Sequence, residues 1–352
     1  MNRLARSLRL HRYMITAMGI YTIALIAFAL WLGGDVKTLM GFLPYLGWGL
    51  ATSALYFMAM MAFYFGRAVK NTKPNKRWFL EVMENFEKST LGYLRSDRCM
   101  DGIVGLFIMF PVSFFFCIAK GLIPTLHQYT IDPKLAASDK WLHFGHYPHE
   151  YLVPWVTRHQ MAAAIDAFYV TWFLVVFLVL DFAIFLDSNQ FRRMRFLWTY
   201  NISWIVLGNV MALFMASVGP LFFSHFYQVA DPYAGLVKHL HEQDKIEHLA
   251  IFDAGNLELG FTKGGEVINM NALSAMPSMH IAIAALLIFY AAKFSRILAA
   301  VFLVYCLLIM ISSVYLGWHY ALDGYVAIVG TWLIWWLSGP LVKKLHPELT
   351  AA

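Results

Sequence analysis

The stretch GWHYALDGYVAIVGTWLIWWLSGPLV, residues 317–342, joins a long apolar run to two ionisable side chains, His319 and Asp323, at its beginning. From residue 320 to residue 342 it contains no charged residue other than Asp323. About 20 such residues in a helix cross the hydrocarbon core of a bilayer. Ionisable residues in a span are costly and are functional candidates. The stretch therefore predicts a transmembrane helix with a functional pair at one end.

The whole chain has the composition of a membrane protein. Of its 352 residues, 60% are hydrophobic and 14% are charged, whereas a soluble domain is about 25% charged. The formal net charge of +6 does not indicate nucleic-acid binding, because the basic residues fall in short segments between apolar runs. In that position they set membrane topology. We expect lipid, and no nucleic acid, as the partner.

Apolar runs predict an all-α, polytopic fold with about eight transmembrane helices. The expected spans are Met14–Leu32, Phe42–Gly66, Gly102–Ala119, Ala162–Leu186, Phe196–Val218, Pro277–Ala292, Ile297–Gly317 and Tyr320–Val342. The first run also resembles a signal peptide, but it is longer than the typical apolar region of about 7–15 residues. An uncleaved helix is expected there.

Basic residues alternate between the loops and predict the topology. The N-terminus, the segment 67–101 and the short turns near residues 193 and 294 are rich in Lys and Arg, whereas the loops 33–41, 120–161 and 219–276 are poor in them. By the positive-inside rule both termini are cytoplasmic and the long loops extracytoplasmic. Within 67–101, apolar residues at helical spacing predict an amphipathic helix on the membrane surface.

With this topology, two histidines and a carboxylate are expected at one depth on the extracytoplasmic side. His280 begins the sixth span, and His319 and Asp323 begin the eighth, where their i, i+4 spacing places them on one helix face. The carboxylate would accept the imidazole N–H and orient the ring, as in a nucleophilic triad. Pro277 suits a first helical turn, and the free N–H groups near Ser278 suit an anion. The alternative is that the histidines only anchor helix ends at the interface.

Two motifs carry a family resemblance. SAMPSMH at 274–280, followed by SSVYLGWHYALD at 312–323, resembles the second and third signature motifs of the type 2 phosphatidic acid phosphatase superfamily, Pro-Ser-x-His and Ser-Arg-x5-His-x3-Asp. The resemblance covers about residues 102–344 and implies a six-helix catalytic domain there. Residues 1–101 would then hold two N-terminal transmembrane helices and the basic amphipathic segment, and residues 345–352 a cytoplasmic tail.

The resemblance also implies a mechanism. His319 would attack phosphorus and form a phosphohistidine, with Asp323 orienting it. His280 would protonate the leaving oxygen and then activate the acceptor. Ser278 would help to hold the phosphoryl oxygens. Neither a metal nor another cofactor is required in that scheme.

Two departures from the family motifs bear on the reaction. Ser313 stands where the third motif has arginine, and ASVGPLFFSHFY at 216–227 stands in place of a Lys-x6-Arg-Pro first motif. This pattern is similar to the inositol phosphorylceramide synthase and sphingomyelin synthase branch. It implies an inositolphosphotransferase-like enzyme that moves a phosphorylated head group from a phospholipid to a lipid alcohol such as ceramide.

Other functions remain open at this stage. The same triad acting with water would make a lipid phosphatase or diphosphatase. A transporter or membrane scaffold is the non-enzymatic alternative, although transporters have polar residues near the midplane. An outward-facing site suits either a bacterial inner membrane or a Golgi-type membrane with the site in the lumen.

The cations that would replace the missing arginines are not fixed by spacing. Candidates for substrate binding are Lys238 and His225 in the loop 219–276 and Arg158 before the fourth span. Asp166, near the outer end of that span, is a candidate for binding a cationic or polyol head group. A polar contact between helices is the alternative for Asp166.

No metal site is predicted. HFGHYPHE at 143–150 has histidines three residues apart, a spacing that occurs in zinc sites, but Pro148 breaks a helix through the run. A surface or re-entrant helix over the active site is the preferred interpretation. The three cysteines, Cys99, Cys117 and Cys306, form no ligand spacing.

Overall fold

The protein is an all-helical bundle in a computed structural model that describes residues 2–32, 43–252 and 274–349. Every regular element among these residues is helical. The helices are α1 (Arg3–Trp31), α3 (Leu43–Asn71), α4 (Trp78–Leu94), α5 (Asp97–Leu126), α6 (Asp132–Leu142), α7 (Pro148–His159), α8 (Ala162–Asp181), η1 (Phe182–Leu186), α9 (Gln190–Ile205), η2 (Val206–Met211), α10 (Ala212–Phe214), η3 (Pro220–Phe222), α11 (Phe223–Phe226), α12 (Ala234–Ile246), α14 (Met279–Ala291), α15 (Arg296–Tyr315), α16 (Ala321–Leu345) and η4 (Pro347–Leu349). The predicted all-α class is confirmed.

Several of these helices are long and apolar enough to cross a membrane. Among the described residues there are five: α1, α8 with η1, α9 through α10, α15 and α16. The shorter α14 is also apolar, and α3 and α5 cover the two remaining predicted spans. A multi-pass membrane protein is therefore indicated. The count of eight spans and the six-helix core stay predictions; Phe42, the loop 33–41 and the end of the tail lie outside the described residues.

The core of the bundle is α14, which packs against α8, α9, α15 and α16. Nearly all of its side chains are buried, and its sequence MHIAIAALLIFYA is apolar on every face, as expected of a central helix. By contrast, α15 turns Ile297, Val301 and Val304 outward. Outward apolar side chains on a long helix fit contact with lipid.

The N-terminal helix is joined to the bundle by a buried charge cluster. Asp101 on α5 accepts a hydrogen bond from Arg6 on α1 at 2.8 Å and one from Arg193 on α9 at 3.1 Å. Both Asp101 and Arg193 are almost fully buried. Buried charges are tolerated when they are paired in this way.

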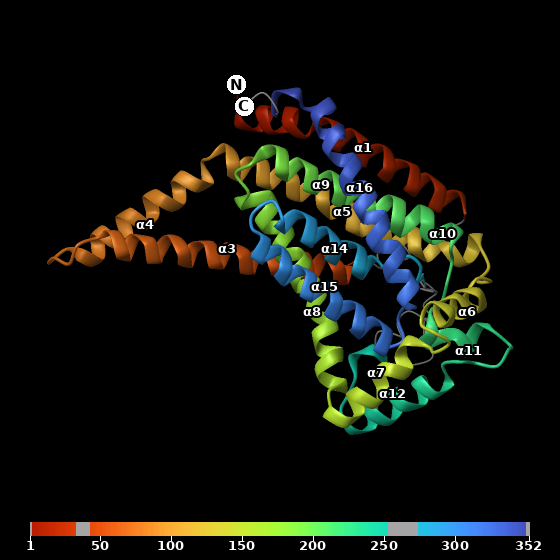
Figure 1. The fold of residues 1–352 in the computed structure, drawn as a ribbon. Coiled ribbons are helices and arrows are strands. Elements are labelled where there is room, and N and C mark those ends of the chain that lie inside the picture. The colour runs from red at the N-terminus through yellow and green to blue at the C-terminus, as the bar shows by residue number, and fades with distance from the viewer. Residues whose placement is uncertain (1, 33–42, 253–273, 350–352) are drawn as a thin grey trace.

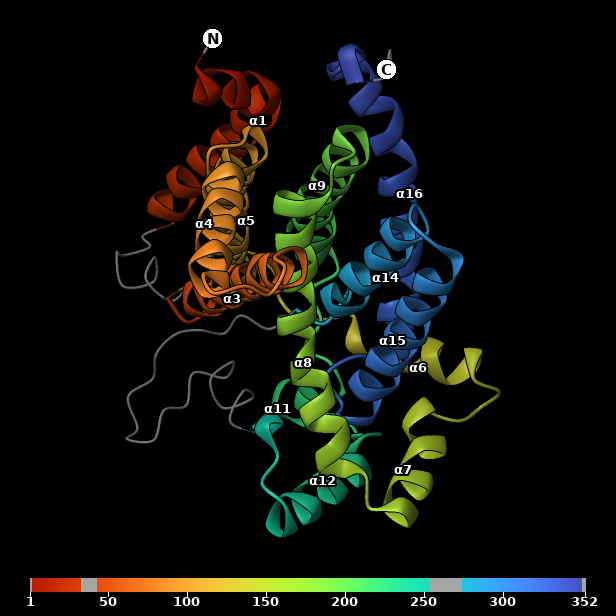
Figure 2. The same ribbon diagram turned by 90° about the vertical axis from the view of Figure 1, so that its left-hand side faces the viewer.

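The two ends of the bundle differ in what they carry. Both termini lie at one end, where Tyr13 and His346 meet edge to face, and α6, α7, α11 and α12 lie at the opposite end (Figures 1 and 2). These four helices are formed by the long loops 120–161 and 219–276. The hairpin of α3 and α4 projects from the side of the bundle (Figure 1). Which end faces the cytoplasm stays a prediction.

Three helix boundaries differ from the expected ones. Helix α5 continues past Ala119 to Leu126, so Lys120 is helical. Helix α14 begins at Met279, after Pro277, and α16 begins at Ala321, after His319. Charged residues and proline in the sequence therefore predict the wrong boundaries. The bundle buries residues that would lie at the ends of an isolated helix.

Candidate active site

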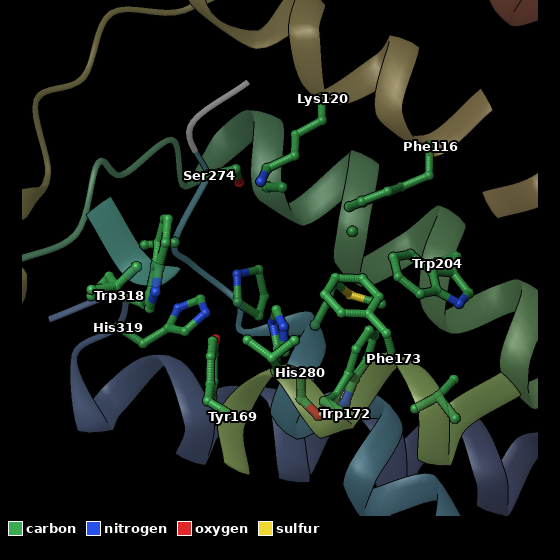
Figure 3. A pocket seen from close by; sticks show the side chains of 18 of the residues that line it. Phe116, Lys120, Tyr169, Trp172, Phe173, Trp204, Ser274, His280, Trp318 and His319 are labelled. Carbon is green, nitrogen blue, oxygen red and sulfur yellow. Dashed lines mark hydrogen bonds between the residues drawn. The ribbon is translucent and has the colours of Figure 1, made fainter. Parts of the chain in front are cut away.

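A cavity of about 250 Å³ lies among α5, α8, α9 and α14, beside the start of α16 (Figure 3). Its lining is mostly aromatic and aliphatic. The lining residues that bear polar or ionisable groups include Lys120, Asp166, Tyr169, Ser274, His280 and His319. An apolar cavity with a few converging polar groups is typical of a ligand site.

His319 and Asp323 form the hydrogen-bonded pair that the sequence predicted. The two atoms, His319 Nδ1 and Asp323 Oδ2, are 3.3 Å apart, and Asp323 is completely buried. His319 precedes the helix rather than lying on it; Asp323, in the first turn of α16, reaches back to the imidazole. With Nδ1 donating to the carboxylate, Nε2 is left with its lone pair for chemistry.

His280 faces the same cavity from the first turn of α14. The centroids of the His280 and His319 rings are 6.2 Å apart. Tyr169 stacks on His280 at 4.6 Å, and Trp172 lies at 4.3 Å and donates its indole N–H to the His280 backbone carbonyl. The aromatic residues of α8 therefore fix the position of the His280 ring.

Helix α6 holds the start of α16 through a buried carboxylate. Asp139 accepts hydrogen bonds from the backbone N–H groups of Ala321 and Leu322 at 3.1 and 3.0 Å. These are first-turn donors that an α-helix leaves unsatisfied. Burial raises the pKa of Asp139, while the two N–H donors act against that rise. The contact anchors the helix that follows His319.

A second carboxylate on α6, Asp132, is fully buried at the centre of a larger network. It accepts hydrogen bonds from the Ser217 and Tyr227 hydroxyls, the N–H groups of Val218 and Gly219, and the Tyr320 hydroxyl. This network thereby holds the segment 216–227, which stands in place of the first family motif, beside the second and third motifs. The segment also bonds to both directly, since Ala275 N–H donates to Ser217 O and Leu221 N–H donates to Gly317 O.

Ser278 caps α14. Its Oγ accepts from the N–H of Ile281 at 3.4 Å, and its own N–H donates to the Asp323 carbonyl at 3.3 Å. The side chain is fully buried, and it is not part of the cavity lining. Pro277, expected in the first turn, precedes the cap in a cis peptide. Ser278 therefore joins the two motif-bearing helices, and its role in phosphate binding stays a prediction.

Lys120 is the cavity residue that the sequence analysis missed. Among the described residues it is the only lysine or arginine in the lining, and Figure 3 shows its side chain reaching from α5 into the cavity. The signal for it in the sequence is the single charge at the end of an apolar run. That charge predicts the end of the span, whereas α5 continues for about two more turns, to Leu126.

The other predicted substrate-binding residues are placed differently. Asp166 lines the cavity, and its Oδ2 accepts the N–H of Ala250 at 2.6 Å, so it joins α8 to the segment after α12. Lys238, His225 and Arg158 are exposed and lie outside the cavity lining. Ser313, at the family's arginine position, is buried and donates its hydroxyl to the Met310 carbonyl.

The histidines of residues 143–150 do not converge. His143 contacts the Tyr325 hydroxyl, His146 pairs with Glu150, and His149 stacks on Tyr147. No group of three potential metal ligands occurs among the described residues. Helix α6 ends before this run and α7 begins at Pro148, as the proline predicted.

Comparison with known proteins places this site in a family. A family model described as the PAP2 superfamily matches residues 133–337, more than half of the chain and inclusive of both histidines and Asp323. No curated protein and no solved structure matches the chain. The matched range holds both motifs and the helices that carry them, and the chain belongs to the PAP2 superfamily.

Proposed function

We propose that this protein is a lipid phosphotransferase that moves a phosphorylated head group, such as inositol phosphate, between lipids. Membership of the PAP2 superfamily supports an activity of the membrane lipid phosphatase or phosphotransferase type. The observation that carries the proposal is the arrangement of His280 and His319 on one apolar cavity, with Asp323 bonded to His319. A cavity with aromatic and aliphatic walls suits a lipid substrate.

In the first step, His319 Nε2 attacks the phosphorus of a phospholipid. The bond from phosphorus to the lipid oxygen breaks as the N–P bond forms, and a proton passes from His280 to the leaving alkoxide. Reacting atoms in a productive complex lie about 3–3.5 Å apart. Ring centroids 6.2 Å apart allow the two imidazoles to contact one phosphoryl group from two sides. The products are a diglyceride and a phosphohistidine bearing the head group.

In the second step, an acceptor hydroxyl attacks the same phosphorus. His280, now without its extra proton, takes the hydroxyl proton, and the N–P bond breaks to release His319. Asp323 stabilises the positive charge that His319 acquires as the N–P bond forms. Atoms and protons balance over the two steps, because the proton lent to the leaving oxygen returns from the acceptor.

Transfer to a lipid alcohol is favoured over hydrolysis by two observations. The family's phosphate-binding arginine is replaced by Ser313, whose hydroxyl is bonded to a backbone carbonyl. The cavity walls are mostly apolar, with Phe116, Phe173 and Trp204 among them. Apolar walls suit the hydrocarbon part of a lipid. A ceramide-like alcohol is the proposed acceptor, at the extracytoplasmic face.

The test uses purified protein in detergent with a head-group-labelled phosphatidylinositol, with and without ceramide. We expect label in a new lipid when ceramide is present, loss of that product in His319→Ala, and full activity in His146→Ala. His146 is a matched control because it is an exposed histidine that pairs with Glu150 and lies outside the cavity lining.

Each other outcome has a defined meaning. Label released only as water-soluble phosphate or head-group phosphate would make the protein a hydrolase. Transfer by His319→Ala at the wild-type rate would remove His319 as the nucleophile. Acid-stable but base-sensitive labelling of the protein would also argue against it, because a phosphohistidine is labile to acid and survives base.

A further inference from the structure

The missing arginines leave the substrate phosphate without an obvious cation. We propose that Lys120 and Ser274 form the subsite that binds the phosphate of the substrate, opposite His280 and His319. This inference rests on the proposed function for its substrate class, a phosphomonoester or phosphodiester anion. Lys120 precedes the range matched by the family model, and neither residue belongs to the catalytic positions of the two motifs.

The position of Lys120 is the first support. It stands on α5, near the end of the bundle that carries His280 and His319, and its side chain enters their cavity (Figure 3). Lys120, His280 and His319 all line this one cavity. A cation held among apolar walls acts on an anion more strongly than one in water, because the effective dielectric constant is lower.

Ser274 supplies an independent observation. Its hydroxyl is buried on the cavity wall and has no hydrogen-bond partner among the described residues. Leaving a buried hydroxyl unpaired costs about 1–3 kcal/mol, so such groups call for an explanation. A phosphate oxygen in the cavity would accept the Ser274 O–H and satisfy it.

Two other cations at this end of the molecule, both predicted as substrate-binding candidates, are less suited to the task. Lys238 is 80% exposed and pairs with Glu242 at 4.0 Å, and Arg158 is exposed on α7. Neither lines the cavity. An exposed ammonium is screened by water and salt. Lys238 therefore serves as a matched control for Lys120.

Lysine and arginine bind phosphate in different ways. A lysine is a compact point charge on a flexible stem, whereas arginine binds phosphate through a rigid planar fork. The rings of Phe116 on α5 and Trp204 on α9 also line the cavity, with their centroids 4.4 Å apart. A single ammonium can follow the phosphate as it moves from the donor lipid to His319.

The experiment measures binding of inorganic phosphate to the detergent-purified protein, by calorimetry and by tryptophan fluorescence. Trp172, Trp204 and Trp318 line the cavity and report on it. A hydrogen bond to a charged group contributes about 1.5–3 kcal/mol, so we expect Lys120→Met to weaken binding about 10- to 100-fold. Lys120→Arg should restore most of it. Ser274→Ala should weaken binding about 2- to 10-fold.

The controls separate this subsite from the proposed reaction. Lys238→Met should bind phosphate as the wild type does. His319→Ala should retain most of the phosphate binding, because Lys120 is intact in that variant. Phosphate binding that depends on Lys120 supports the subsite even if no lipid transfer is found. Equal binding by wild type and Lys120→Met, or no binding by the wild type, overturns the subsite even if transfer is found. Thermal unfolding of each variant verifies that it is folded.

Discussion

The carboxylate of Asp132 accepts a hydrogen bond from the hydroxyl of Tyr320 at 3.0 Å, which joins the first residue of α6 to the residue that follows His319. Seven residues further along α6, Asp139 binds the first turn of α16. Both carboxylates lie on the buried face of α6, with Leu135 and Ala136 between them. This short helix outside the bundle therefore sets where His319 stands.

Asp132→Ala is predicted to be the most damaging change in α6. It removes the acceptor from several buried donors, and each unsatisfied buried group costs about 1–3 kcal/mol. We expect the free energy of unfolding to fall by at least about 3 kcal/mol, with loss of activity. Thermal and denaturant unfolding in detergent measure this decrease in the free energy of unfolding. Glu242→Ala, which removes an exposed carboxylate on α12, should change stability by less than about 0.5 kcal/mol; an equal loss in both variants would contradict the prediction.

Asp139→Ala should act on catalysis more than on folding. Losing a helix cap costs about 0.5–2 kcal/mol, and the freed first turn of α16 lets His319 move. We expect a lower kcat with a nearly unchanged KM for the donor lipid, and partial rescue by Asp139→Asn, which keeps one acceptor oxygen. Steady-state kinetics of the transfer reaction test this. A rise in KM alone would show that α6 binds substrate rather than positioning His319.

Gly219→Ala tests the close approach of the segment 216–227 to the loop before α16. Gly219 has φ +80°, and an added Cβ would lie 2.6 Å from the carbonyl oxygen of Trp318. Both the left-handed backbone and the contact oppose alanine, so a loss of about 2 kcal/mol or more is expected. Gly235→Ala on α12 is the control, because its Cβ would meet nothing within 4 Å and alanine favours a helix. Unfolding midpoints that agree for the two variants would refute the close approach.

His149 predicts a pH dependence of stability. The ring is buried between Tyr147 and Tyr233, and burial lowers the pKa of His149 from 6.5 to about 4. The folded state thus favours the neutral ring. Its contribution is complete above pH 6.5 and is lost as the pH falls from 6.5 towards 4, by up to about 3 kcal/mol.

The measurement is the free energy of unfolding of wild type and His149→Phe at several pH values. Phenylalanine keeps the ring packing and cannot be protonated, so the stability of the wild type relative to this variant should decrease on acidification from pH 7 to pH 4.5. A difference that stays constant over this range would show that His149 is not buried as a neutral ring.

Much of the fold follows from the sequence, because lipid imposes a strong constraint on composition. Backbone groups in a bilayer must be satisfied within the segment, so long uncharged runs such as 324–342 become helices in almost any context. The pairing of His319 with Asp323 is likewise local, since the two residues are four positions apart. The approach of His280 was predicted from depth and from the two motifs.

Where the contacts are distant in sequence, the sequence alone was insufficient. Lys120 was interpreted as the end of a span, because a single charge carries no information about which cavity surrounds it. Asp132 and Asp139 resemble solvated charges of a loop helix, yet they are buried against donors up to 188 residues away.

The sequence by itself determined the helices, the membrane character and the pairing of His319 with Asp323, since these depend on hydropathy and local spacing. Only the tertiary structure decided which cation enters the cavity and which carboxylates hold the start of α16. The physical reason is that a charge is buried only where partners offset its desolvation, and those partners are brought together by the packing of helices far apart in the chain.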